Sequence, residues 1–231
     1  MSKTNVGILQ CGHSAEYVIE RHGNYDAWFH TLFADETDLS FTNWAVVDME
    51  FPESVRDADA WLLTGSPFGA YEDHAFIPPL EQFIRDIASA KIPMLGICFG
   101  HQIIAQALGG RVEKFQGGWK LGRQDYQIEG FGSASLNAWH QDQVLDAPEG
   151  AEVIAQAEGC AIAGLRMDDH VLTLQPHPEI SNPLLSDLIT ARRGTGSYRD
   201  EDMDRAQSDT ALPVDSLTVS QWMAHFLRGT V

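Results

Sequence analysis

Short apolar runs alternate with amphipathic stretches over the first half of the chain. Four of these runs are short and rich in β-branched residues, and they predict buried strands: NVGILQC (5–11), TNWAVVDM (42–49), ADAWLLTGS (58–66) and IPMLGIC (92–98). The stretch FIPPLEQFIRDIASA (76–90) places its apolar residues at helical spacing, and a second helical pattern ends at Gly109 and Gly110. This alternation predicts an α/β fold with a mostly parallel central sheet and helices on both faces.

The pattern changes after this first half. The segments 111–128 and 150–177 carry Gly or Asp turns between short alternating runs, so they predict a small antiparallel β extension. Helices are expected over 182–194 and 216–229, separated by an acidic, proline-containing linker around 200–215.

The length and hydropathy of the chain bound its organisation. Its 231 residues are 44% hydrophobic and 21% charged, which suits a single domain over 1–231, with a core at about 5–190 and a C-terminal helical segment at about 182–231. The opening segment lacks a charged leader followed by an apolar stretch, and no run approaches the ~18 apolar residues of a membrane helix. We therefore expect a cytoplasmic protein.

Charge and cysteine usage exclude several classes of function. The chain has 33 Asp and Glu against 15 Lys and Arg, a formal net charge of -18, which disfavours binding to nucleic acid or to an anionic membrane. Three cysteines without a CxxC spacing argue against disulfides and structural zinc, and for a reducing compartment. Since no metal-ligand motif occurs either, we expect neither a metal nor another cofactor.

The segment GICFG (96–100) brackets Cys98 with two glycines between a predicted strand and a predicted helix. This fits the G-x-nucleophile-x-G elbow, in which a sharp turn exposes the central side chain above the sheet. The helix N-terminus beyond the sulfur would favour the thiolate, which is the nucleophilic form. A free cysteine is more often a small buried filler, but the glycine bracket favours a catalytic role here.

A cysteine nucleophile needs a base and a group that orients the base, and LTLQPHPEI (172–180) offers both. Two prolines keep this chain extended, and residues two apart then point the same way, so His177 and Glu179 can share a face. Glu179 would accept from one imidazole nitrogen and leave the other free to face sulfur. The alternative is an ordinary loop after a strand. Most of the other histidines are expected to be surface or packing residues, and His101 is assigned no chemistry.

A cysteine nucleophile that attacks a carbonyl group also needs donors for the oxyanion that develops. By elbow geometry, the backbone N–H of Phe99 supplies one. A second is expected from the turn TGSPFGAY (64–71), at the backbone of Gly65 or Ser66, although a plain β-turn would look the same.

Together, LGICFGHQ, LQPHPE and LLTGSP resemble the motifs of the class I (triad) glutamine amidotransferase family, over about residues 5–190. The chain is most similar to the stand-alone, GMP synthase-like branch. The resemblance implies a flavodoxin-like three-layer fold, attack of Cys98 on the glutamine side-chain amide, protonation of the departing ammonia by His177, and hydrolysis of a γ-glutamyl thioester. It also implies that Gln102 contacts the substrate.

Two further substrate contacts are expected from NAWHQDQV (137–144), which resembles a substrate-contacting loop of the family. They are His140 and Asp142, although an ordinary polar turn would have the same composition.

The chain departs from the family pattern in two ways. Gly65-Ser66 stands where relatives often carry two glycines, so which amide donates is open, and serine would be strained there if its φ were positive. No P-loop is present, and GTGSYR (194–199) is expected to be a loop that ends a helix.

Three functions therefore stay open. The chain could release ammonia from glutamine for a partner synthetase, or hydrolyse γ-glutamyl peptides or amides with the same triad. A third reading is a non-catalytic binding or redox-sensing module with Cys98 as an oxidisable thiol. The pairing of His177 with Glu179 favours an enzyme, because a sensor needs no oriented base.

Overall fold

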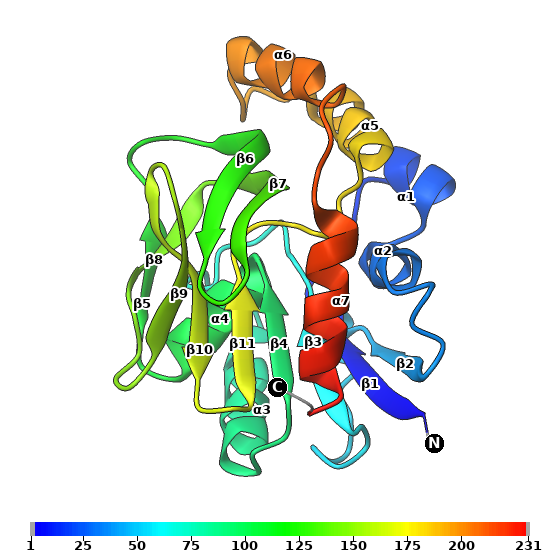
Figure 1. The fold of residues 1–231 in the computed structure, drawn as a ribbon, viewed down its shortest axis with the longest axis vertical. Coiled ribbons are helices and arrows are strands. Elements are labelled where there is room, and N and C mark those ends of the chain that lie inside the picture. The colour runs from blue at the N-terminus through cyan, green and yellow to red at the C-terminus, as the bar shows by residue number, and fades with distance from the viewer. Residues whose placement is uncertain (1–2, 230–231) are drawn as a thin grey trace.

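The computed structural model describes residues 3–229, and nine of their strands form one sheet in the order β2-β1-β3-β4-β11-β10-β9-β6-β7. One half of the sheet is parallel (Figure 1). Its strands are β1 (Thr4–Leu9), β2 (Leu39–Trp44), β3 (Ala60–Leu63), β4 (Met94–Ile97) and β11 (Val171–Leu174). The predicted parallel core is therefore confirmed.

The antiparallel extension continues the same sheet beyond β11. Its strands are β6 (Lys120–Ile128), β7 (Gly132–His140), β9 (Glu152–Ala157) and β10 (Cys160–Met167). A separate two-stranded ribbon pairs β5 (Arg111–Lys114) with β8 (Asp142–Asp146). The extension lies on one side of the parallel strands, where it can supply side chains to their carboxyl ends (Figure 1).

Helices cover both faces of the parallel strands, and the side chains of each strand alternate between the two layers (Figure 1). In β3, Leu62 packs in the layer that contains α2 (Tyr25–Leu32) and α7 (Ser216–Leu227). Its neighbour Leu63 packs against α3 (Ile77–Ser89) and α4 (Phe99–Ala107). These two cores make the three-layer fold that the sequence predicts.

A third group of helices lies beyond the end of the sheet: α1 (Glu16–His22), α5 (Asn182–Arg192) and α6 (Asp200–Asp209) (Figure 1). The prediction of a linker around 200–215 was wrong, because α6 occupies most of it. Three acidic residues in the first turn of α6 suit a helix N-terminus, and Met203 and Ala206 are buried in the cluster beneath it.

Other boundaries differ from the sequence prediction in detail. The strand predicted over 42–49 ends at Trp44, and a short 3-10 helix, Val46–Asp48, follows. The early helices α1 and α2 were not predicted. Within residues 3–229, the structure has no helix that combines the length and the apolar character needed to span a bilayer.

Candidate active site

Cys98 occupies a tight corner between β4 and α4. Its φ of 54° and ψ of -102° lie where an L-residue is strained. The flanking glycines make the corner feasible, since a Cβ on Gly100 would lie 2.4 Å from the Leu63 carbonyl oxygen and one on Gly96 would lie 2.6 Å from the Gly100 carbonyl. The predicted strand, elbow and helix are all present, with the sulfur at the carboxyl end of a central strand.

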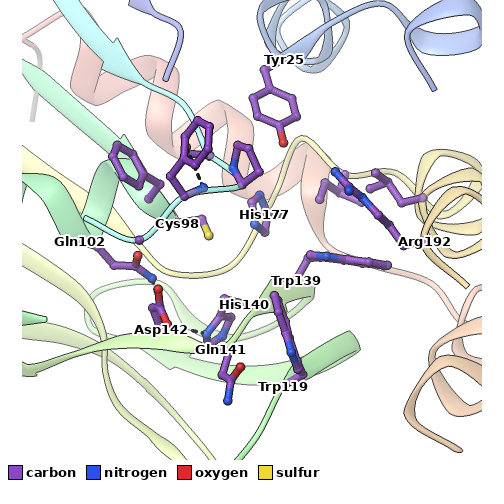
Figure 2. Close-up of a pocket in the computed structure, with 18 of the residues that line it drawn as sticks. Tyr25, Cys98, Gln102, Trp119, Trp139, His140, Gln141, Asp142, His177 and Arg192 are labelled. Atoms are coloured by element: carbon purple, nitrogen blue, oxygen red, sulfur yellow. Dashed lines mark hydrogen bonds between the residues drawn. The ribbon is translucent and has the colours of Figure 1, made fainter. Parts of the chain in front are cut away.

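The segment after β11 carries His177 to this corner. The Cys98 N–H donates to the Leu174 carbonyl at 2.8 Å, and the His177 N–H donates to the Asn137 carbonyl on β7, also at 2.8 Å. Nδ1 of His177 lies 2.6 Å from Oε1 of Glu179, with both side chains almost completely buried. Figure 2 shows the Cys98 sulfur beside the His177 ring. The structure therefore brings together the three residues predicted to act as nucleophile, base and orienter.

The electrostatics of His177 suit a proton carrier. Burial opposes charge on the ring, but the Glu179 carboxylate and the Cys98 sulfur beside it outweigh this effect and raise the pKa of His177 well above its ordinary value. Nε2 of His177 is buried and has no hydrogen-bond partner within the described residues. This nitrogen is therefore available to exchange a proton with a group held at the sulfur.

The turn after β3 lies beside the same ring, since a Cβ on Gly65 would approach Cε1 of His177 to 3.2 Å. The Thr64 hydroxyl donates to the Gly65 carbonyl at 2.8 Å. The Gly65 carbonyl and the Ser66 N–H belong to one trans peptide group and point in opposite directions, so this bond also fixes the direction of the Ser66 N–H. Neither Gly65 nor Ser66 has a positive φ, so the strain considered for serine at this position does not arise.

The amide of Gln102 is largely occupied by the protein itself. Its Nε2 donates to the Asp142 carbonyl at 2.8 Å and to Oε1 of Gln175 at 3.1 Å. Gln102 thereby ties α4 to the start of β8, and its carbonyl oxygen is the atom left to face a ligand.

His140 and Asp142 lie beside Gln102 (Figure 2). Burial, reinforced by the nearby His177, lowers the pKa of His140 to about 3, so its ring is neutral. Its Nδ1 lies 3.3 Å from the Asp142 carbonyl. The Asp142 carboxylate accepts from the Tyr71 hydroxyl at 3.1 Å, and partial burial raises its pKa.

A cavity of about 310 Å³ joins these groups, and every residue predicted for the site lines it. It also extends to side chains that the sequence did not single out: Tyr25, Trp119, Trp139, Arg192 and Tyr198 (Figure 2 labels all but Tyr198). Five elements or loops supply them, one for each side chain. Two of them lie in segments that the sequence analysis quoted: Trp139 in NAWHQDQV, and Tyr198 in GTGSYR, which was correctly predicted as a loop after a helix.

One further histidine, His101, and the two other thiols, Cys11 and Cys160, lie in the interior. His101 is fully buried between the Thr173 hydroxyl, 2.8 Å from Nδ1, and the Ile162 carbonyl, 3.2 Å from Nε2. Burial lowers its pKa to about 4, which suits a packing role. Burial also raises the pKa of Cys11 and of Cys160 to about 12, so neither thiol is readily ionised. Among the described residues, no group of three or more His, Cys, Asp or Glu side chains is arranged to hold a metal ion.

Comparisons with known proteins found a matching family model and several related chains. The family model "Glutamine amidotransferase class-I" matches residues 24–189. "Gamma-glutamyl peptidase 3" of Arabidopsis thaliana is 28% identical over 233 residues, 93% of each chain. A chain of the glutamine-hydrolyzing GMP synthase of Halobacterium salinarum is 28% identical over 174 residues, 71% of this chain and 88% of the relative.

Among solved structures, a glutamine amidotransferase from Thermotoga maritima matches with a TM-score of 0.72 at 22% identity, covering 100% of this chain and 97% of that one. At this identity the match shows the fold.

Proposed function

Because the chain belongs to the class I glutamine amidotransferase family, we propose that it hydrolyses γ-glutamyl amide bonds through a thioester on Cys98. The substrates proposed are glutamine and γ-glutamyl peptides or amides. The observation that carries the proposal is the strained corner that holds Cys98 beside the buried His177–Glu179 pair. A strained, positive-φ cysteine costs stability, and its retention is expected where the strain serves chemistry.

In the first half of the reaction, the Cys98 thiolate attacks the γ-carbonyl carbon and forms a carbon–sulfur bond. His177 then transfers its Nε2 proton to the amide nitrogen as the carbon–nitrogen bond breaks, so the product leaves as ammonia or an amine. Glu179 holds the ring by Nδ1 and stabilises its positive charge.

In the second half, water replaces the departed amine beside His177. Nε2 takes a proton from that water, the oxygen attacks the thioester, and the sulfur leaves as thiolate while glutamate is released. In both halves the carbonyl oxygen becomes negative. We propose that two backbone N–H groups, those of Phe99 and Ser66, donate to this oxygen. Phe99 is the first residue of α4, so its N–H has no partner within the helix. The direction of the Ser66 N–H is fixed by the hydrogen bond from Thr64 to the Gly65 carbonyl.

The γ-glutamyl group carries an α-ammonium and an α-carboxylate, and one end of the cavity has groups to match. We assign the α-ammonium to Asp142, together with the free carbonyl oxygen of Gln102 and the neutral His140. Lys114 also lines this end, and its charge acts on Asp142, so it complements the α-carboxylate. Gln102 and Asp142 lie on the same side of Cys98 (Figure 2).

Two physiological uses of this chemistry are supported by different relatives. Likeness to a chain of a GMP synthase supports the supply of ammonia to a synthetase partner, whereas likeness to a γ-glutamyl peptidase over nearly the whole chain supports hydrolysis of γ-glutamyl peptides. A redox-sensing role for Cys98 accounts for neither the buried base nor the cavity. Hydrolysis is therefore the function proposed.

The proposal is tested by measuring amine release from glutamine and from γ-glutamyl amides by the wild type and by Cys98→Ser. Cys160→Ser serves as the matched control, since that thiol is also buried but lies outside the cavity. We expect Cys98→Ser to lose hydrolysis while its circular dichroism spectrum and the activity of the control are retained. Unchanged hydrolysis by Cys98→Ser would overturn the proposal.

A further inference from the structure

The part of the cavity beyond His177 has an unusual electrostatic feature. Arg192, at the end of α5, is half-buried and lines the cavity, yet no described carboxylate lies within ion-pair distance of it. The next residue, Arg193, is exposed and pairs with Asp204 at 2.8 Å. The chain has 33 acidic side chains, yet none of those described pairs with this partly buried guanidinium. Arg192 is therefore suited to bind an anionic group of a ligand.

Aromatic side chains line the same cavity as this guanidinium. Trp119 and Trp139 each contact Tyr198, with ring centroids 4.6 Å and 5.4 Å apart, and Nε1 of Trp139 donates to the Tyr198 hydroxyl at 3.2 Å. All three rings are partly exposed and line the cavity. The Arg192 charge acts on both Tyr25 and Tyr198, where it opposes the rise in pKa that burial causes. Figure 2 shows Arg192 near Trp139, with Tyr25 on the other side of Arg192 from Trp139. We refer to Trp119, Trp139 and Tyr198 as the aromatic wall.

The reaction geometry decides which part of a substrate meets these groups. In Figure 2, Gln102 and Asp142 lie on one side of Cys98, while Arg192 and Trp139 lie on the other, beyond His177. The scissile nitrogen must face His177, because that ring protonates it. The γ-glutamyl chain then extends toward Asp142, and the leaving amine extends toward Arg192.

From this we infer that the cavity holds a leaving-group subsite for an aromatic α-amino acid, with Arg192 binding its carboxylate and Trp119, Trp139 and Tyr198 packing against its side chain. The inference rests on the proposed function and names its substrate class: γ-glutamyl dipeptides whose second residue is aromatic. Ammonia has neither a carboxylate nor a ring, so glutamine leaves this part of the cavity unused.

The test compares kcat/KM for four compounds: γ-glutamyl-phenylalanine, γ-glutamyl-alanine, γ-glutamyl-phenethylamide and glutamine. The second lacks the ring, the third lacks only the carboxylate, and glutamine lacks both. We expect γ-glutamyl-phenylalanine to be the best substrate. Arg192→Gln should lower kcat/KM ~10- to 100-fold for the two substrates with a second carboxylate and leave the phenethylamide and glutamine unchanged, as loss of a charged hydrogen bond requires. Arg192→Lys should restore part of the loss.

Arg193→Gln is the matched control, because it removes a neighbouring cation outside the cavity and should leave all four values unchanged. Equal turnover of the four compounds, or an equal loss on all of them in Arg192→Gln, would overturn the subsite while hydrolysis itself stood. If no compound were hydrolysed, the proposed function would fail separately. Calorimetric binding of γ-glutamyl-phenylalanine to Cys98→Ala would then decide the subsite: weakening by Arg192→Gln supports it, and no binding overturns it.

Discussion

The charge of Glu179 can be removed with little change of shape by Glu179→Gln. The carboxylate lies 2.6 Å from Nδ1 of His177 in an almost fully buried pair, and its second oxygen has no hydrogen-bond partner in the described chain. A glutamine amide can still accept the Nδ1–H bond. The substitution therefore tests the charge itself, apart from the orientation of the ring.

The expected magnitude follows from the separation of the charges. Opposite unit charges about 4 Å apart attract by ~4 kcal/mol at an effective dielectric constant of about 20. The retained neutral hydrogen bond is worth about 1 kcal/mol, which leaves a loss of about 3 kcal/mol. At about 1.36 kcal/mol per factor of ten, kcat should fall ~150-fold. KM should change little, because Glu179 is assigned no contact with substrate.

The assay is steady-state release of ammonia from glutamine and of amine from a γ-glutamyl amide. Asp187→Asn is the control, since Asp187 lies 2.8 Å from Nε2 of His22 in a pair outside the cavity. That variant should retain wild-type kcat. A kcat for Glu179→Gln within a factor of two of wild type would refute the reasoning, because the imidazolium would then not depend on the carboxylate.

The same variant has a pH signature in stability. The pKa of His177 is raised in the folded state above its ordinary 6.5, so its protonation stabilises the fold fully below that pH and less as pH rises through the folded pKa. Glu179→Gln removes the main attraction behind this shift. In thermal denaturation, the stability advantage of the wild type should be largest near about pH 6 and narrow as pH rises. A stability difference between the wild type and Glu179→Gln that increased with pH would contradict this prediction.

Three further substitutions test the geometry of the corner. Cys98→Gly should be about 1 kcal/mol more stable than Cys98→Ala, or ~2–4 °C in Tm, because a φ of 54° strains any side chain; equal Tm values would contradict this. Gly100→Ala should cost about 1–3 kcal/mol in denaturant unfolding, since its Cβ would lie 2.4 Å from the Leu63 carbonyl oxygen; wild-type stability would refute the close approach. Thr64→Val removes the hydroxyl that holds the Gly65 carbonyl, so kcat should fall ~10-fold, less than the loss of a whole oxyanion donor, with KM little changed; an unchanged kcat would argue against this positioning role.

The features that the sequence predicted well are those set by local chemistry. The glycines at 96 and 100 are required by contacts within a few ångströms of the corner. Such patterns can be recognised in the sequence without knowledge of the rest of the fold. The parallel core could also be predicted from local sequence, because each buried strand is an almost continuous apolar run, as in β3. The segment after His177 was predicted to be extended, but it forms a turn in which the Ile180 N–H donates to the His177 carbonyl at 3.2 Å, and this turn brings Glu179 to His177.

The features that the sequence did not reveal depend on long-range packing. The segment that forms α6 is so polar that it suggests a linker, and its helix is stabilised by burying Met203 and Ala206 among residues distant in the chain. The aromatic wall is similar, since Trp119, Trp139 and Tyr198 belong to separate segments that come together only in the fold. Which side chains reach the cavity is decided by how α5 and the loop after it pack over the antiparallel strands.

Covalent trapping of the nucleophile tests the central claim most directly. The protein would be treated with an electrophilic glutamine analogue, digested, and examined by mass spectrometry, with and without a competing γ-glutamyl compound. The account predicts stoichiometric modification of Cys98, protection by the competitor, and no modification of Cys11 or Cys160. An unmodified Cys98 under conditions in which the analogue labels other residues would contradict it.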